Sequence, residues 1–165
     1  MLNQTTVTAL QTLLYLCQRS ETTPVAPAEI ARQLEASLPY LSKIHTQLVR
    51  ADLLRAHRGA KGGVTLARAP KDITLLEIVE ACQGKVLGDY CQPYDDLAVV
   101  CGFHAAMHDL QGAILGSLSR WTLEDLRQRP RPTGPLQGHA SCRMACAVPK
   151  QGGAERMAEN LGAPL

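Results

Sequence analysis

Apolar and polar positions in the first part of the chain repeat with the period of an α-helix. Residues 3–18 place apolar side chains three and four positions apart, which predicts a first helix, and the segment ETTPVAP then interrupts the pattern. A short second helix is predicted over 27–34, because Pro27 fits the first turn of a helix, where its missing N–H costs nothing.

A third helix is predicted almost directly after the second. Ser37 is its expected N-cap. Its apolar stripe predicts a buried face made of Leu41, Ile44, Leu48 and Val49. Two short helices joined by a tight turn are typical of a helix-turn-helix.

The next residues predict two short strands joined by a glycine-rich turn, with Leu54 in the first strand and Val64 and Leu66 in the second. The tip of this hairpin, RGAKGG, combines two cations, Arg58 and Lys61, with three glycines. Such a loop can approach another backbone closely and offer charge to phosphates or to a minor groove. It lacks the spacing and the following helix of a phosphate-binding loop. The pattern predicts a mainly α fold with a small β-wing, a winged helix-turn-helix.

Two capping signals predict the helices that follow the wing. Thr74 and Glu77 form a Thr-x-x-Glu capping box at the start of a fourth helix, and Thr122 and Asp125 offer a similar cap further on. Between them, residues 102–121 predict a long helix.

That long helix carries a heptad-like seam. Its apolar residues are spaced by 4, 3, 4 and 7 positions: Phe103, Met107, Leu110, Ile114 and Trp121. A seam of this kind on a long helix beyond a small domain favours a dimer interface, and packing against the chain's own core is the alternative. Gly112 and Gly116 would let a partner helix come close.

The chain divides into four parts on these signals. Residues 1–84 form the predicted winged helix-turn-helix domain and residues 85–101 a cysteine-bearing connection. Residues 102–129 form the predicted dimerisation helix with its following cap. Residues 130–165 are rich in Pro, Gly and small residues without periodicity, which predicts a flexible tail that contains cysteines.

Charge is segregated along the chain, although the net charge is only +2. Residues 1–72 carry nine Lys and Arg against five Asp and Glu, and residues 73–126 carry two against eight. A basic front and an acidic middle suit a protein that presents one face to a polyanion, and solvated faces without special meaning are the alternative.

The 165 residues suit one compact domain with extensions. No signal peptide and no run of 18 apolar residues is evident, so we expect a soluble, cytoplasmic protein without a membrane partner. Six cysteines in a reducing compartment then indicate metal ligation, redox sensing or burial rather than structural disulfides. Cys17 and Cys82 lie on apolar helix faces and are expected in the core.

An ordered series of short motifs resembles the Rrf-type family of bacterial transcription regulators, which includes IscR, NsrR and CymR. The resemblance covers roughly residues 5–126. It rests on these residues, in order: Ile30-Ala31-Arg32, Ser37-Leu38-Pro39-Tyr40-Leu41-Ser42-Lys43-Ile44, Leu53-Leu54, Arg58-Gly59, Gly62-Gly63, Leu66-Ala67, Pro70, Ile73-Thr74-Leu75 and Ile78-Val79-Glu80-Ala81.

This resemblance implies a homodimer that binds an operator in double-stranded DNA as a repressor or an activator. Residues near the start of the third helix are expected at the major groove or its phosphates: Ser37, Tyr40, Ser42 and Lys43. The ring of Tyr40 can instead pack inward. The resemblance puts Arg58 in the minor groove and Lys61 at its phosphate rim.

Iron–sulfur members of the family carry three cysteines before the dimerisation helix, and the IscR-like ones have a histidine three residues after the last. Cys91 and Cys101 match the outer pair and His104 matches the histidine, but the middle cysteine is absent. Residues 1–18 also hold no Asp, Glu or His that could serve as the ligand some relatives take from the partner's first helix. The resemblance implies a 2Fe–2S or 4Fe–4S cluster held by Cys91, Cys101 and His104.

Two tail cysteines, Cys142 and Cys146, stand four positions apart and would face the same way on a helix. They are either additional cluster donors or incidental thiols. A reversible disulfide between Cys91 and Cys101 is the main alternative to a cluster. Zinc is a weaker alternative, because nine residues between the two cysteines do not form the short knuckle that structural zinc sites use.

Other functional classes fit the sequence less well. No nucleophile stands beside a base at a recognisable spacing and no phosphate loop follows a strand, so an enzyme is not expected. A partner-binding module without DNA binding would not need the charged wing. The sequence therefore predicts a DNA-binding transcription regulator with a cysteine-based sensor.

Overall fold

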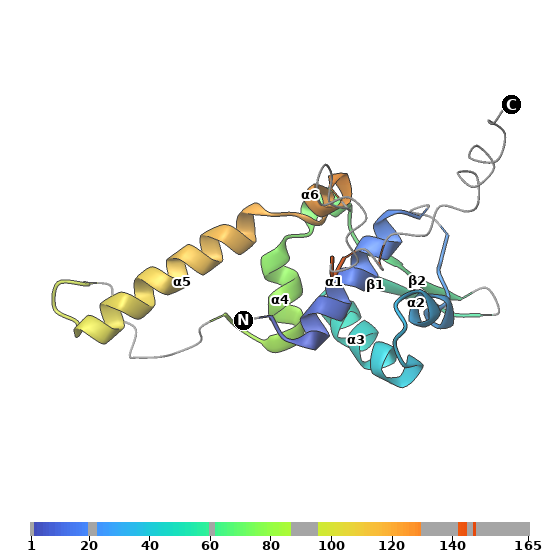
Figure 1. The fold of residues 1–165 in the computed structure, drawn as a ribbon, viewed down its shortest axis with the longest axis horizontal. Helices are drawn as coiled ribbons and strands as arrows, with labels where there is room; N and C mark the ends of the chain where they lie inside the picture. Colours follow the sequence, from blue (N-terminus) through green and yellow to red (C-terminus); the bar gives the residue numbers. More distant parts are fainter. Residues whose placement is uncertain are drawn as a thin grey trace, which may run out of the picture.

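The computed structural model describes residues 2–19, 23–59, 62–86, 96–129, 142–144 and 147. They form a body of short helices and one hairpin, from which a single long helix projects (Figure 1). In chain order the elements are α1 (Gln4–Cys17), α2 (Pro27–Gln33), α3 (Leu38–Arg50), β1 (Leu54–His57), β2 (Gly63–Leu66), η1 (Pro70–Asp72), α4 (Leu75–Gln83), α5 (Gly102–Arg120) and α6 (Leu123–Gln128). The mainly helical fold with a small β-wing is confirmed.

Helix α1 is the centre of the core. Its N-cap residue is Asn3, whose side-chain oxygen accepts a hydrogen bond from the Thr6 N–H at 2.8 Å. Helices α3, α4 and α6 and strand β2 pack around it, so every residue from 6 to 17 is buried. Cys17 and Cys82 are buried, as predicted, and burial raises the pKa of the Cys82 thiol to about 11. Cys82 is therefore an inert core thiol.

Helices α2 and α3 form the predicted helix-turn-helix. Pro27 stands at the first position of α2, and Glu35 closes the turn with a left-handed backbone (φ +53°). The Ala36 N–H donates to the Ala31 carbonyl at 2.9 Å within this turn. Ser37 is the N-cap residue of α3, as predicted, although its side chain makes no capping hydrogen bond.

The buried face of α3 differs from the predicted stripe at one position. Leu41, Ile44 and Leu48 are buried, whereas Val49 is 38% exposed and His45 is only 6% exposed. Because successive residues are about 100° apart around a helix, position 45 lies next to Leu41 and Leu48, and position 49 lies further from the stripe's centre. A polar imidazole thus occupies a place where the pattern predicts an apolar side chain.

The wing is an antiparallel hairpin in which Leu54 pairs with Leu66 and His57 with Gly63. Val25, just before α2, adds a bridge to Val64 through two backbone hydrogen bonds of 2.9 and 3.0 Å. A Cβ atom on Gly63 would lie 2.4 Å from the Val25 carbonyl oxygen, and one on Gly62 would lie 2.5 Å from the His57 carbonyl oxygen. These two glycines therefore allow close packing within the wing itself.

Both predicted capping boxes are present. Thr74 and Glu77 cap α4, and Thr122 and Asp125 cap α6. The two caps lie side by side, because the Leu75 N–H donates to the Trp121 carbonyl and the Leu123 N–H donates to the Ile73 carbonyl, each at 2.9 Å. These two hydrogen bonds fix the end of α5 to the start of α4.

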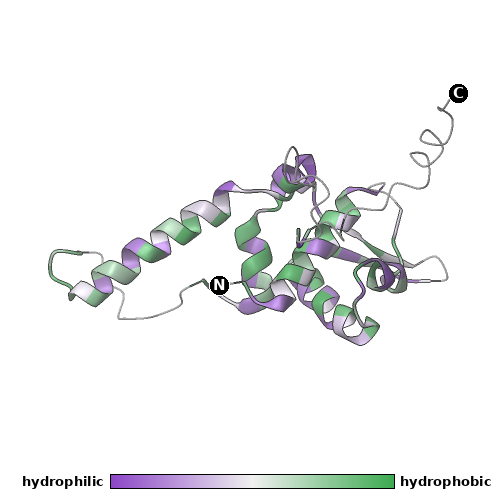
Figure 2. Ribbon diagram, in the orientation of Figure 1, coloured by the Kyte–Doolittle hydropathy of each residue, from purple (hydrophilic) through white to green (hydrophobic). Residues whose placement is uncertain are grey.

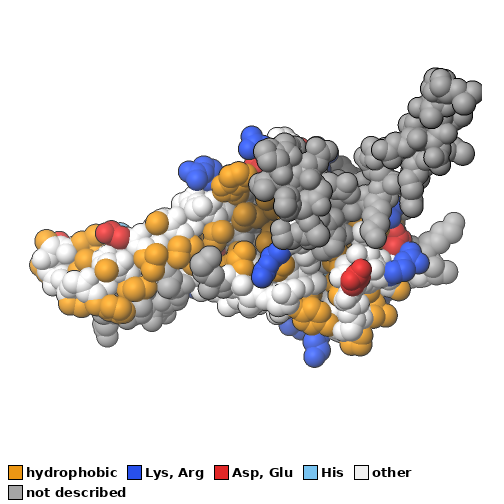
Figure 3. All heavy atoms as spheres, in the orientation of Figure 1, with side chains coloured by type: hydrophobic (Ala, Val, Ile, Leu, Met, Phe, Trp, Pro, Cys, Tyr) orange, Lys and Arg blue, Asp and Glu red, His pale blue; other side chains and the backbone are white. Residues whose placement is uncertain are grey.

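Helix α5 runs from this junction away from the body (Figures 1 and 2). Its 19 residues span about 28 Å at the rise of an α-helix. Phe103 is 63% exposed, and Leu110 and Trp121 are also exposed, so the described residues do not cover these seam positions. Apolar side chains are visible along the projecting helix in Figure 3.

Four residues of the predicted tail are described, and three of them contact the body. Ala147 is fully buried in the core, Met144 packs against it, and the Gln11 side-chain amide donates to the Arg143 carbonyl. The other residues of the predicted tail lie outside the described residues. Within the described part of the chain, no helix is both long enough and apolar enough to cross a membrane.

Candidate nucleic-acid interface and sensor site

The solvent-facing side of α3 carries two of the predicted DNA contacts. Ser42 and Lys43 are exposed there, off the buried stripe of Leu41 and Ile44. The Ser42 hydroxyl donates to the Leu38 carbonyl at 2.9 Å and keeps its acceptor lone pairs. Ser37 is exposed at the start of the helix.

Tyr40 lies differently from these three residues. It is half-buried and packs against the core, and its hydroxyl donates to the Thr5 hydroxyl of α1 at 3.4 Å. The ring of Tyr40 therefore packs inward, which was the alternative given for this residue in the sequence analysis.

The wing places Arg58 directly after β1, where it is exposed. Gly59 follows with a left-handed backbone (φ +107°), a conformation that glycine adopts without strain. Lys61, the second predicted wing contact, lies outside the described residues.

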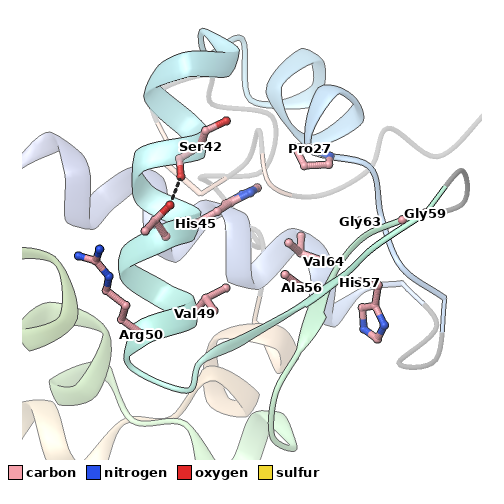
Figure 4. Close-up of a pocket in the computed structure, with 12 residues that line it drawn as sticks. Pro27, Ser42, His45, Val49, Arg50, Ala56, His57, Gly59, Gly63 and Val64 are labelled. Atoms are coloured by element: carbon pink, nitrogen blue, oxygen red, sulfur yellow. Dashed lines mark hydrogen bonds between the residues drawn. The ribbon is translucent and has the colours of Figure 1, made fainter.

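Two further polar residues lie on the exposed side of α3 and were not among the predicted contacts. Thr46 and Arg50 are exposed and follow Ser42 at intervals of four, so they continue its row along the helix. The Thr46 hydroxyl donates to the Ser42 carbonyl at 2.9 Å (Figure 4). The same interval of four is visible in the sequence and could have indicated that these residues share an exposed face with Ser42.

A hollow of about 490 Å³ separates α3 from the wing (Figure 4). His45 and Val49 line it from the helix, and Ala56 and Val64 line it from the strands. Burial lowers the pKa of His45 to about 4, so its imidazole is neutral near pH 7.

Two of the predicted sensor residues, Cys101 and His104, lie at the free end of α5. Cys101 is the N-cap of this helix and is exposed, and its Sγ accepts a hydrogen bond from the His104 N–H at 3.5 Å. His104 is buried one turn into the helix. Cys91 lies outside the described residues.

These positions test part of the implied cluster site. A thiolate donor and an imidazole one helical turn apart suit iron–sulfur ligation in chemistry, but a cluster commonly takes four ligands. Cys142 is half-buried in the tail, and Cys146 lies outside the described residues. Within the described ranges, no group of three or more His, Cys, Asp or Glu could hold a metal ion. The described residues thus fit part of a cluster site and do not complete one.

Comparisons with known proteins match most of the chain. A family model named Rrf2 and described as an iron-dependent transcriptional regulator matches residues 2–129. Protein aau3 of Rhizobium meliloti (strain 1021) is 32% identical over 74% of this chain and 82% of its own length. The HTH-type transcriptional regulator IscR of Klebsiella pneumoniae (strain 342) is 32% identical over 72% of this chain and 74% of its own length.

Solved structures show the same fold. T. potens IscR has a TM-score of 0.62 at 25% identity, over 81% of this chain and 93% of that chain. CymR of B. subtilis, described as a global cysteine regulator, has a TM-score of 0.64 at 24% identity, over 78% and 96% respectively. The similarity to CymR supports the winged helix-turn-helix fold alone.

Proposed function

The chain belongs to the Rrf2 family of transcriptional regulators, and from this membership we propose that it binds an operator in double-stranded DNA as a homodimer. Helix α3 enters the major groove and the wing reaches the adjacent minor groove. The observation that carries this proposal is the exposure of Lys43 on α3 and of Arg58 on the neighbouring wing. Both side chains offer positive charge to a phosphate backbone.

The contacts divide by role. Ser37, Ser42 and Lys43 contact base edges or flanking phosphates, whereas Tyr40 contributes chiefly by positioning α3 against α1. Arg58 enters the minor groove, and Lys61 contacts the phosphates at its rim. No step of this function requires catalysis, so we do not assign an enzymatic activity.

Lys43→Ala is expected to weaken operator binding by about 1–2 kcal/mol and to reduce the slope of log K against log salt by about 1, because one phosphate contact is lost. Fluorescence anisotropy at several salt concentrations measures both quantities. Arg120→Ala is the control, since Arg120 is an exposed cation at the far end of α5 from the sensor residues. Unchanged affinity and an unchanged salt slope would show that α3 does not contact the DNA backbone through Lys43.

Arg58→Ala is expected to cost about 1–3 kcal/mol and to relax the preference for A·T pairs beside the site, because an arginine in a narrow minor groove reads groove shape. Lys61→Ala should weaken binding to all sequences alike. Titrations on a selected site and on a variant with altered flanks separate the two effects. If Arg58→Ala binds both sites as the wild type does, the wing has no part in recognition.

The exposed seam of α5 supports the homodimer. Its uncovered apolar residues and the open space around Gly112 and Gly116 suit a partner helix at close range. A dimer of this kind presents two α3 helices to successive major grooves, whose centres are about 34–36 Å apart.

We further propose that Cys91 and Cys101 form the sensing pair, with His104 as an additional ligand of an iron–sulfur cluster. The exposed thiol of Cys101, the family's description as iron-dependent and the IscR relatives support this proposal. A bound cluster supplies a redox-sensitive link between the ligands that hold it. A reversible disulfide between Cys91 and Cys101 is the alternative, and the exposure of Cys101 suits it equally.

Cys91→Ser and Cys101→Ser are each expected to abolish the response of DNA affinity to oxidation, because either change removes one member of the pair. Iron content and the visible spectrum of protein purified without oxygen then distinguish the two chemistries, since only a cluster gives colour. Truncation after Pro130 tests whether Cys142 and Cys146 contribute. If both serine variants keep the iron content, oxidation response and affinity of the wild type, these cysteines are not the sensor.

A further inference from the structure

The hollow between α3 and the wing contains a buried imidazole. Figure 4 shows His45 pointing from α3 toward Pro27, and Val49, Ala56 and Val64 line the same hollow. The volume of about 490 Å³ falls within the range of small-molecule sites in proteins. The hollow lies on the face that the proposed function assigns to DNA.

Among the described residues, His45 lacks a hydrogen bond that its burial requires. Its side chain is 6% exposed, and its Nε2 atom is inaccessible to solvent and has no hydrogen-bond partner among the described residues. A buried polar atom without a partner costs about 1–3 kcal/mol and is rare in native proteins. Because water does not reach this nitrogen, a ligand in the hollow supplies the missing partner only when the imidazole ring turns toward the hollow.

The rest of the lining indicates an uncharged ligand. Val49, Ala56 and Val64 give the hollow an apolar wall. Arg50 also lines it, but Figure 4 shows the guanidinium directed away from the wing. The His57 ring is paired with the Thr65 hydroxyl at 2.9 Å and points away from His45. Among the described lining residues, no side chain brings a positive charge into the hollow to receive a phosphate.

We propose that this hollow binds a small, uncharged, largely apolar molecule with one hydrogen-bonding group, such as a phenol, which His45 recognises. The apolar wall holds the body of the ligand, and the neutral imidazole pairs with its hydroxyl group. Because the hollow opens between the two DNA-contacting elements, a bound ligand opposes the docking of DNA. This last consequence rests on the proposed function.

The test uses the full-length protein with 2-naphthol as the probe. Ring nitrogens of labelled histidines are followed by NMR at pH 7.5, and we expect a saturable shift at His45. His45→Phe keeps the ring's size without its nitrogens and should weaken 2-naphthol binding about tenfold, the worth of one hydrogen bond. His57→Phe is the matched control, since His57 borders the same hollow, and it should bind 2-naphthol as the wild type does. The anion 2-naphthoate should bind more weakly than 2-naphthol.

Operator binding is measured in parallel. We expect 2-naphthol to weaken DNA binding of the wild type and of His57→Phe, and to affect His45→Phe far less. The absence of a saturable shift, or equal losses in the two variants, would overturn the ligand site. Tighter binding of 2-naphthoate than of 2-naphthol would also overturn it, since the hollow would then be an anion-binding site. A saturable, His45-dependent shift in a protein that binds no DNA would support the ligand site and contradict the proposed function.

Discussion

Gly63→Ala is expected to lower the free energy of unfolding by about 3 kcal/mol, since it forces an overlap within the wing. The added Cβ would lie 2.4 Å from the carbonyl oxygen and 2.6 Å from the carbonyl carbon of Val25. These are backbone atoms, so no side chain can turn aside to relieve the overlap. Relief requires separating Val25 from Val64 and breaking the two hydrogen bonds that join them. Urea denaturation followed by circular dichroism measures the loss.

Gly102→Ala is the matched control for this substitution. Gly102 begins α5, and a Cβ there meets nothing within 4 Å. Alanine is also the better helix former, so the control is expected to be neutral or slightly stabilising. A Gly63→Ala variant as stable as Gly102→Ala would mean that the wing is not held against Val25 in solution.

The second prediction with a large effect concerns the stability of the protein at low pH. Between pH 6.5 and 4, we expect the free energy of unfolding of the wild type to fall by about 3 kcal/mol more than that of His45→Phe. The pKa of His45 is about 4 in the folded protein, against about 6.5 in an unfolded chain. The unfolded chain therefore takes up a proton first as the pH falls, and the wild type loses stability between pH 6.5 and 4. Phenylalanine cannot take up this proton.

Urea midpoints at pH 7.5, 6, 5 and 4.5 measure this difference. At pH 7.5 the variant should already be at least as stable as the wild type, because it removes a buried nitrogen that has no hydrogen-bond partner in the described part of the chain. His57→Phe again serves as the control, because it makes the same substitution at another residue that lines the hollow. Parallel curves for His45→Phe and the wild type would show that His45 is not buried as described.

Local signals in the sequence predicted most of the fold. Thr74 with Glu77 and Thr122 with Asp125 were identified as caps, because a capping box depends on residues only three positions apart. The place of His45 could not be predicted in this way. Periodicity favoured Val49 as the fourth apolar residue of the stripe. Which residue is buried next to the stripe depends on how α3 packs against α2 and the other elements of the fold.

The glycines of the wing show a similar limit. Their presence predicted a tight turn, but the reason for Gly63 lies in its contact with Val25, which is 38 positions away in the chain. For the sensor, the Cys-x-x-His spacing placed Cys101 and His104 one helical turn apart, as the structure has them. The remaining donors depend on tertiary or intersubunit contacts, which the sequence spacing does not specify.

The junction of α5 with α4 has a mechanical consequence. Helix α5 is held at Trp121 by the hydrogen bonds between the start of α4 and the start of α6. Cys101 lies at the other end of α5, about 28 Å away. A tilt of about 10° at Trp121 therefore moves the Cys101 end by about 5 Å. Conversely, a displacement of about 5 Å at Cys101 requires only a small rotation of α5 at its other end, beside α4. Helix α4 in turn packs directly on α3.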